Sequence, residues 1–134
     1  MDKRIIQKQI LINAAPEIVW KVFTEPAITE NMGGEYVSDW KIGSAIGWKD
    51  HEGNMRTKGT ILSIEPGIFL QHNLLNDDDT VSSVITYSFT NKDGHTMLNA
   101  KEELYYAMTD EQFDEANKGW DYALLAVKEI AEAL

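Results

Sequence analysis

The sequence has 134 residues, of which 43% are hydrophobic and 25% are charged, and it contains no cysteine. These proportions are typical of a globular chain that can bury its own core, so we expect a single domain over residues 1–134. The absence of cysteine excludes disulfides, zinc–thiolate sites and thiol nucleophiles, and it fits a cytoplasmic location.

The charge balance excludes two classes of partner. Twenty-two Asp and Glu residues against 12 Lys and Arg residues give a formal net charge of -10. Nucleic-acid phosphates and anionic bilayer surfaces repel such a chain, so we expect no nucleic-acid partner. No apolar run reaches the length of a membrane span, so we expect neither insertion into a membrane nor export.

The beginning of the chain predicts one strand followed by two short helices. Residues 4–13 are rich in β-branched side chains, which favour a strand. Pro16 and the acidic Glu17 are typical of a first helical turn, and that helix is expected to end before Pro26. A second short helix is predicted to end at Gly33.

The middle of the chain has the pattern of consecutive antiparallel strands. Short apolar runs alternate at regular intervals with clusters of Gly, Asn and Asp, which tolerate the positive φ of tight turns. The predicted strands cover residues 36–40, 45–49, 57–65, 68–75, 81–90 and 95–104. With the first strand they make a sheet of about seven strands.

Alternation along two of these strands predicts which side chains face the interior. Side chains two residues apart share one face of a strand, and here one face is apolar and the other mostly polar. The side chains assigned to the interior are Leu70, His72, Leu74, Ile85, Tyr87 and Phe89.

The end of the chain predicts a long amphipathic helix. Thr109 and Gln112 match a capping box, and apolar residues follow at helical spacing on one stripe. The stripe consists of Phe113, Ala116, Trp120, Ala123, Leu124, Val127, Ile130, Ala131 and Leu134. At 1.5 Å per residue such a helix reaches roughly 37 Å, so we expect the sheet to curve around it. A twisted sheet and a single helix fit imperfectly, which predicts an apolar pocket between them.

Several segments carry a family resemblance through their order and spacing. They are residues 12–26, Gly43, Gly59 to Pro66 with Leu70, Ile85 to Phe89, Gly94 with Thr96 to Leu98, and Gly119 with Trp120. Together they resemble the START-like helix-grip superfamily (SRPBCC), and within it the branch named for the C-terminal domain of the activator of the heat-shock-protein-90 ATPase (AHSA-like). The resemblance covers nearly the whole chain. The sequence Asn31 to Gly34 departs from the family pattern, because many members have a tryptophan there.

The resemblance implies an α+β helix-grip fold, with a curved antiparallel sheet around a long C-terminal helix and two short helices after the first strand. It also implies a deep hydrophobic cavity that binds lipids or other apolar compounds. In some relatives, such as the aromatase/cyclases of polyketide pathways, it implies catalysis. The family name makes a chaperone a candidate partner.

We therefore expect a non-catalytic module that binds a small apolar or amphipathic molecule, without cofactor or metal, as a monomer or homodimer. The residues expected to line the site are Trp48, Ile61, Leu70, His72, Tyr87, Trp120 and Leu124. One alternative is a cyclase or hydrolase that uses His72 or Tyr87 as acid or base. Another is a domain that acts on a chaperone.

Some single residues allow two interpretations. His72 either orients a ligand or is a core histidine bonded to a neighbour, and the core interpretation is favoured. Either Glu102 or Glu103 could face the cavity mouth as a base, although a surface position is favoured. Asp77 to Asp79 lack the glycine and the distal glutamate of a calcium loop, so we predict a solvated turn. The three histidines lack the spacing of a metal site.

Overall fold

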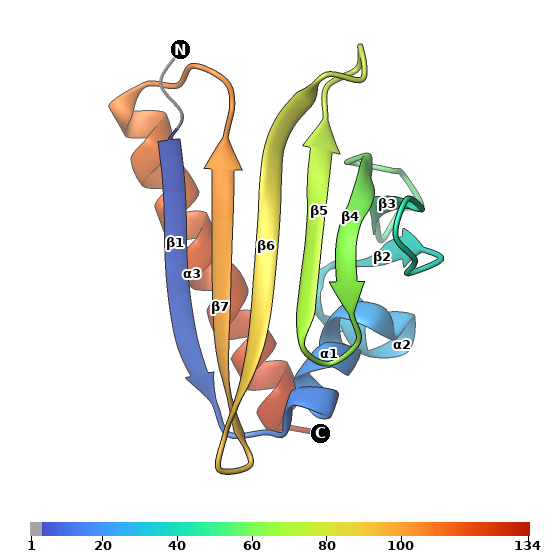
Figure 1. Cartoon of the computed structure of the whole chain (residues 1–134), viewed down its shortest axis with the longest axis vertical. Coiled ribbons are helices and arrows are strands. Elements are labelled where there is room, and N and C mark those ends of the chain that lie inside the picture. Colours follow the sequence, from blue (N-terminus) through green and yellow to red (C-terminus); the bar gives the residue numbers. More distant parts are fainter. Residues whose placement is uncertain (1–3) are drawn as a thin grey trace.

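The computed structural model describes residues 4–134, and it consists of one antiparallel sheet with a long helix across one face (Figure 1). The seven strands lie in the order β1-β7-β6-β5-β4-β3-β2. The elements are β1 (Arg4–Ile12), α1 (Pro16–Thr24), α2 (Pro26–Thr29), η1 (Glu30–Met32), β2 (Gly34–Ser38), β3 (Ala45–Asp50), β4 (Gly59–Glu65), β5 (Phe69–Leu75), β6 (Val81–Lys92), β7 (His95–Leu104) and α3 (Asp110–Glu132). This is the predicted helix-grip fold.

The two short helices follow the signals in the sequence. Pro16 lies in the first turn of α1, where its missing N–H costs no hydrogen bond. Glu25 has an extended backbone between α1 and α2, and Pro26 begins α2. Gly33 ends the 3-10 turn η1 with a φ of 101°, a conformation that favours glycine. The second predicted helix is therefore α2 together with η1.

The strand boundaries that differ from the prediction include those of β2 and β4. Residues 36–40 were expected to form a strand, but β2 spans Gly34–Ser38 and Trp40 has a φ of 56° in the following turn. The strand expected over 57–65 begins only at Gly59, where the backbone of β4 approaches Asn73 of β5 too closely for any side chain. Both differences reflect contacts between segments that a local pattern does not contain.

The long helix is bound to the edge strand β1 near both of its ends. Arg4 forms an ion pair with Asp110 at 2.8 Å, and the backbone N–H of Asn13 donates to a carboxylate oxygen of Glu132 at 2.8 Å. Thr109 and Gln112 form both hydrogen bonds of the predicted capping box. The helix α3 is thereby held across the face of β1, β7 and β6 (Figure 1).

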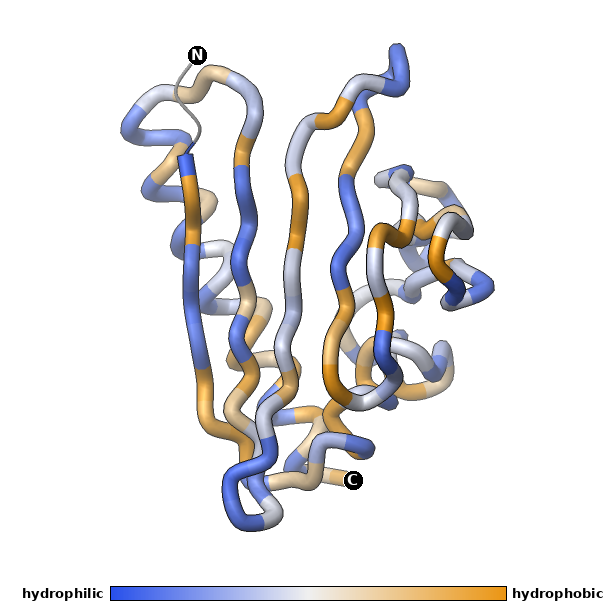
Figure 2. The backbone as a smooth tube through the Cα atoms, in the orientation of Figure 1, coloured by the Kyte–Doolittle hydropathy of each residue, from blue (hydrophilic) through white to orange (hydrophobic). Residues whose placement is uncertain are grey.

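The core lies between this helix and the sheet. Hydrophobic and hydrophilic stretches follow one another along the strands (Figure 2), and the apolar side chains that the strands bury lie on the face toward α3. All the side chains assigned to the interior by alternation are buried or half-buried, and Leu124, Val127 and Ala131 of α3 are buried opposite them. Leu134 is 61% exposed, because the helix ends at Glu132, so its assignment to the apolar stripe was wrong.

Among residues 4–134, no helix combines the length and the apolar character that crossing a bilayer requires.

Candidate functional site

A cavity of about 370 Å³ lies between the sheet and α3. Its walls come from α1, η1, β2, β5, β6, β7 and α3, and most of the wall side chains are apolar. They are Phe23, Met32, Tyr36, Leu74, Ile85, Tyr87, Glu102, Ala116, Gly119, Trp120, Ala123, Leu124 and Val127. We call this the large cavity.

A smaller cavity of about 220 Å³ adjoins it. The two cavities share the wall residues Tyr36, Leu74 and Ile85. The other walls of the small cavity come from β3, β5 and the segment before β4, and consist of Ile46, Gly47, Trp48, Thr57 and His72. The two cavities are therefore neighbours in the core, with three wall residues in common.

Small residues on α3 leave room for the large cavity. Ala116, Gly119 and Ala123 line it at helical spacing, and their small side chains leave space beside the larger wall residues Trp120 and Leu124. A Cβ atom added at Gly119 would meet nothing within 4 Å. The sequence signal for this space was the glycine before Trp120 in an otherwise regular helix.

One carboxylate lies in the wall of the large cavity. Oε1 of Glu102 accepts a hydrogen bond from Nε1 of Trp120 at 2.9 Å, and Oε2 accepts one from Oγ of Ser83 at 2.8 Å. The surface position favoured for Glu102 was wrong. Alternation along β7 contains the signal, because Glu102 falls on the same strand face as the buried Ala100 and Leu104.

A pair of tyrosines forms part of the wall between β2 and β6. The side chains of Tyr36 and Tyr87 are hydrogen-bonded to each other. Burial raises the pKa of both phenols, and the hydrogen bond to Tyr87 partly offsets the rise for Tyr36. Tyr87 has its pKa raised further by Tyr36 and by the charge of Glu102. Both phenols are therefore neutral around neutral pH. One O–H is donated within the pair, so one phenol proton remains to donate to another molecule.

His72 is buried beside the small cavity, with 2% of its surface exposed. Its Nδ1 lies 3.0 Å from the backbone carbonyl oxygen of Asn73, whereas Nε2 has no hydrogen-bond partner among the described residues. Burial lowers the pKa of His72, and the Asn73 carbonyl and the charge of Glu102 oppose this only in part. The imidazole is therefore neutral near pH 7.

The structure brings five of the seven predicted site residues to the cavities. Tyr87, Trp120 and Leu124 line the large cavity, and Trp48 and His72 line the small one. Ile61 and Leu70 face the interior as expected, but they are buried in the core and line neither cavity. That any of the seven contacts a ligand stays a prediction.

Several wall residues were missed from the sequence. Leu74 and Ile85 had been assigned to the interior but not to the site, and their alternation carried that information. Tyr36 and Met32 had no usable signal, because they reach the cavity only through the placement of β2 and η1 next to α1 and α3. Met32 lies in the segment that departs from the family pattern, so the departure falls within the cavity wall.

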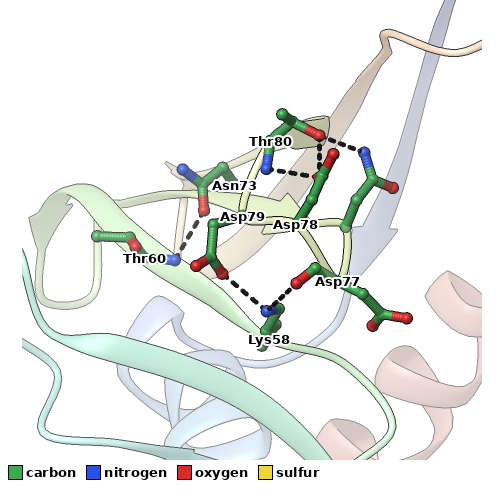
Figure 3. Close-up of polar contacts among 8 residues, drawn as sticks. Lys58, Thr60, Asn73, Asp77, Asp78, Asp79 and Thr80 are labelled. Carbon is green, nitrogen blue, oxygen red and sulfur yellow. Dashed lines mark hydrogen bonds and ion pairs between the residues drawn. The ribbon is translucent and has the colours of Figure 1, made fainter.

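In the acidic turn predicted at Asp77 to Asp79, oxygen atoms accept hydrogen bonds from neighbouring side chains and backbone (Figure 3). Nζ of Lys58 binds Oδ1 of Asp79 at 2.7 Å and the backbone oxygen of Asp77 at 3.3 Å. Oδ1 of Asp78 accepts hydrogen bonds from the backbone N–H and the hydroxyl of Thr80, which lowers its pKa. Within residues 4–134, no three or more His, Asp or Glu side chains gather as metal ligands would.

The topology, the long helix across the concave sheet and the cavity between them define a START-like helix-grip domain. Residues 13–132 match the model of the family described as "Activator of Hsp90 ATPase homolog 1-like protein", so the chain belongs to this family. No curated protein matches the sequence significantly.

Solved structures share the fold over nearly the full length. The chain is similar to ChR145 from Cytophaga hutchinsonii, with 27% identity, 99% of this chain and 97% of that chain covered, and a TM-score of 0.79. For MLL2253 from Mesorhizobium loti the identity is 18%, the coverage 97% and 98%, and the TM-score 0.81. For a protein described as the Aha1 dimer from Colwellia psychrerythraea, the identity is 17%, the coverage 96% of both chains, and the TM-score 0.78.

Proposed function

We propose that this chain is a binding module that holds a small apolar or amphipathic molecule in the large cavity between the sheet and α3. The observation that carries the proposal is the hollow itself, about 370 Å³ with mostly apolar and aromatic walls. Protein cores are close-packed and seldom leave voids much larger than a water molecule. Ligand sites, in contrast, have volumes of about 300–1,000 Å³ and few polar wall groups.

The arrangement of the polar wall groups supports binding over catalysis. The raised pKa values of Tyr36 and Tyr87 make either phenol a poor base near neutral pH. The carboxylate of Glu102 is held by Trp120 and Ser83, and this geometry suits a fixed hydrogen-bond acceptor. A cyclase or hydrolase that uses Tyr87 as its base is therefore the weaker candidate.

Action on a chaperone ATPase is the second candidate, supported by the description of the family. It predicts a change in the ATPase rate of a heat-shock-protein-90 chaperone when this chain is added. An unchanged rate, in the presence and absence of a ligand of the cavity, would remove this candidate and leave the binding module unaffected.

The test of the binding module is a pair of substitutions on α3. Gly119→Leu places a side chain at the cavity wall, whereas Lys118→Leu places the same side chain at the exposed neighbouring position. Replacing glycine inside a helix also raises helix stability by about 0.5–1 kcal/mol, so the first variant is expected to fold. Loss of binding in that variant cannot then be assigned to unfolding.

The probe is Nile red, a neutral apolar dye, titrated against each protein with dye fluorescence and melting temperature as readouts. The parent chain and Lys118→Leu are expected to bind the dye and to melt at a higher temperature in its presence, by mass action. Gly119→Leu is expected to bind about tenfold more weakly. Absence of binding to the parent chain, by the dye and by a broad panel of lipids, would contradict the proposal.

A further inference from the structure

We infer that the ligand of this site is an uncharged molecule with a hydroxyl group, and that this hydroxyl donates a hydrogen bond to Nε2 of His72. The inference rests on the proposed function and names the chemistry that the site selects. It assigns the small cavity to the polar end of the ligand and the large cavity to its apolar body.

The tautomer of His72 follows from its one hydrogen bond. A backbone carbonyl oxygen has no proton to give, so the contact of Nδ1 with the Asn73 oxygen at 3.0 Å requires the proton on Nδ1. In the neutral ring Nε2 then carries a lone pair and acts only as an acceptor. His72 is a wall residue of the small cavity, and Nε2 is its ring nitrogen without a partner.

This acceptor is an exception among the described residues. Among the buried side-chain nitrogen and oxygen atoms of residues 4–134, Nε2 of His72 alone has no hydrogen-bond partner. Native proteins pair nearly all such atoms, because an unpaired buried polar group loses its hydration without compensation. A molecule that brings a hydroxyl to Nε2 removes this penalty, which gives it an advantage over a purely apolar competitor.

A ligand hydroxyl has one advantage over a lone water at this position. Buried waters typically make about three hydrogen bonds to protein groups. Two wall residues of the small cavity, Tyr36 and Thr57, carry hydroxyl groups, whereas Ile46, Leu74 and Ile85 offer no hydrogen-bond partner. A hydroxyl carried by a ligand needs fewer partners, because the apolar body of the ligand anchors it.

The two cavities lie close enough for one molecule to reach both. The ring of His72 lies 6.5 Å from the ring of Tyr87, a wall residue of the large cavity. Tyr36 belongs to both walls, and its ring lies 6.4 Å from His72 and 5.0 Å from Trp48. His72 therefore lies next to the wall of the large cavity, within reach of a ligand that extends into the small one.

The charges of the site select against anions. The polar wall groups that are fixed as acceptors are Nε2 of His72 and the carboxylate of Glu102. A carboxylate ligand offers only acceptors to these groups and adds repulsion to a chain with a net charge of -10. A fatty acid can accept a hydrogen bond from the Tyr36–Tyr87 pair but meets repulsion from Glu102, so an alcohol or phenol of similar size is favoured over it.

The experiment compares three probes that share one apolar body: 2-naphthol, 2-methoxynaphthalene and 2-naphthoate. The first has a hydroxyl donor, the second replaces its proton by a methyl group, and the third is an anion. Titration calorimetry at neutral pH is expected to give 2-naphthol about fivefold tighter binding than the methyl ether, the ratio expected for one net hydrogen bond. The naphthoate is expected to bind the weakest.

Variants at His72 separate its role from packing. His72→Phe removes the acceptor, so the ratio between naphthol and ether is expected to fall to about one. His72→Gln keeps an acceptor oxygen near the position of Nε2, and the preference for naphthol is expected to survive in part. His51→Phe makes the same change at an exposed histidine that lines neither cavity, and its ratio is expected to equal that of the parent chain.

A side-chain nitrogen spectrum gives an independent readout. The ¹⁵N resonance of Nε2 in His72 is expected to shift when 2-naphthol binds and to stay unchanged with the ether. Equal binding of naphthol and ether, or tightest binding of naphthoate, would overturn the inference while leaving the binding module intact. Failure of all three probes, of Nile red and of the lipid panel would overturn the binding module and this inference with it.

Discussion

The indole Nε1 of Trp120 donates a hydrogen bond to Oε1 of Glu102 at 2.9 Å, and this bond joins the middle of α3 to β7 at the wall of the large cavity. The other carboxylate oxygen accepts from Ser83 on β6. A carboxylate partly removed from water is costly unless its oxygens are hydrogen-bonded. The three side chains therefore form one unit that fixes the helix against two strands.

Trp120→Phe is expected to lower the free energy of unfolding by about 1.5–3 kcal/mol, because it removes a hydrogen bond to a charged group. Urea unfolding of this variant, of Glu102→Leu and of the double variant measures the coupling between the two side chains. We expect a coupling energy of about 0.5–3 kcal/mol, as for residues in direct contact. Additive effects, within about 0.5 kcal/mol, would show that the bond contributes nothing specific.

The same substitution at two glycines is expected to have opposite effects. Alanine at Gly59 would place its Cβ against the backbone carbonyl oxygen of Asn73, so the paired strands must move apart. We expect a loss of about 1–3 kcal/mol or more in unfolding free energy. Alanine at Gly119 meets nothing within 4 Å and is expected to stabilise α3 by about 0.5–1 kcal/mol. The urea midpoints at unchanged slope report both effects, and a shift in the same direction for both would contradict this account.

The start of α3 offers a prediction on helix capping. The Thr109 hydroxyl accepts from the backbone N–H of Gln112 at 3.0 Å, and the Gln112 side chain accepts from the backbone N–H of Thr109 at 2.9 Å. Thr109→Ala is expected to cost about 1 kcal/mol, measured by urea unfolding. Thr109→Ser keeps the hydroxyl and serves as the control, with a smaller loss expected. Equal losses for serine and alanine would assign the effect to the methyl group of threonine.

The elements could be predicted from the sequence because their signals are local. Ile85, Tyr87 and Phe89 alternate with polar residues, so the face of β6 that turns inward follows from neighbouring residues alone. The capping box likewise lies within four residues of sequence. Family resemblance then supplied the curved antiparallel sheet around the helix, whereas the order of the strands, with β1 beside β7, was not predicted.

The site could be predicted only in part, because its walls depend on long-range placement. Alternation indicates that Ile61 and Leu70 point inward, but it does not indicate how far along the strands the cavity extends. Both residues lie in the filled part of the core. Tyr36 reaches the cavity through the position of the edge strand β2. Alternation places Glu102 on the apolar face, whereas its charge favours the surface. The hydrogen bonds from Trp120 and Ser83, which are distant in sequence, stabilise the charge in the cavity wall.

The buried His72 predicts how stability depends on pH. Burial lowers the pKa of His72 in the folded chain below the ordinary value of 6.5. The Asn73 carbonyl and the charge of Glu102 oppose this in part. The neighbouring Tyr36 and Tyr87 stay neutral. The unfolded chain therefore takes up a proton at this residue at a higher pH than the folded chain does. The contribution of His72 to stability is fully present above pH 6.5 and decreases as the pH falls below it. His72→Gln has no such group, so its unfolding free energy is expected to fall less than that of the parent chain between about pH 7 and pH 5. Urea unfolding of both proteins across this range provides the measurement, and parallel curves would show that the imidazole is not desolvated as its burial indicates.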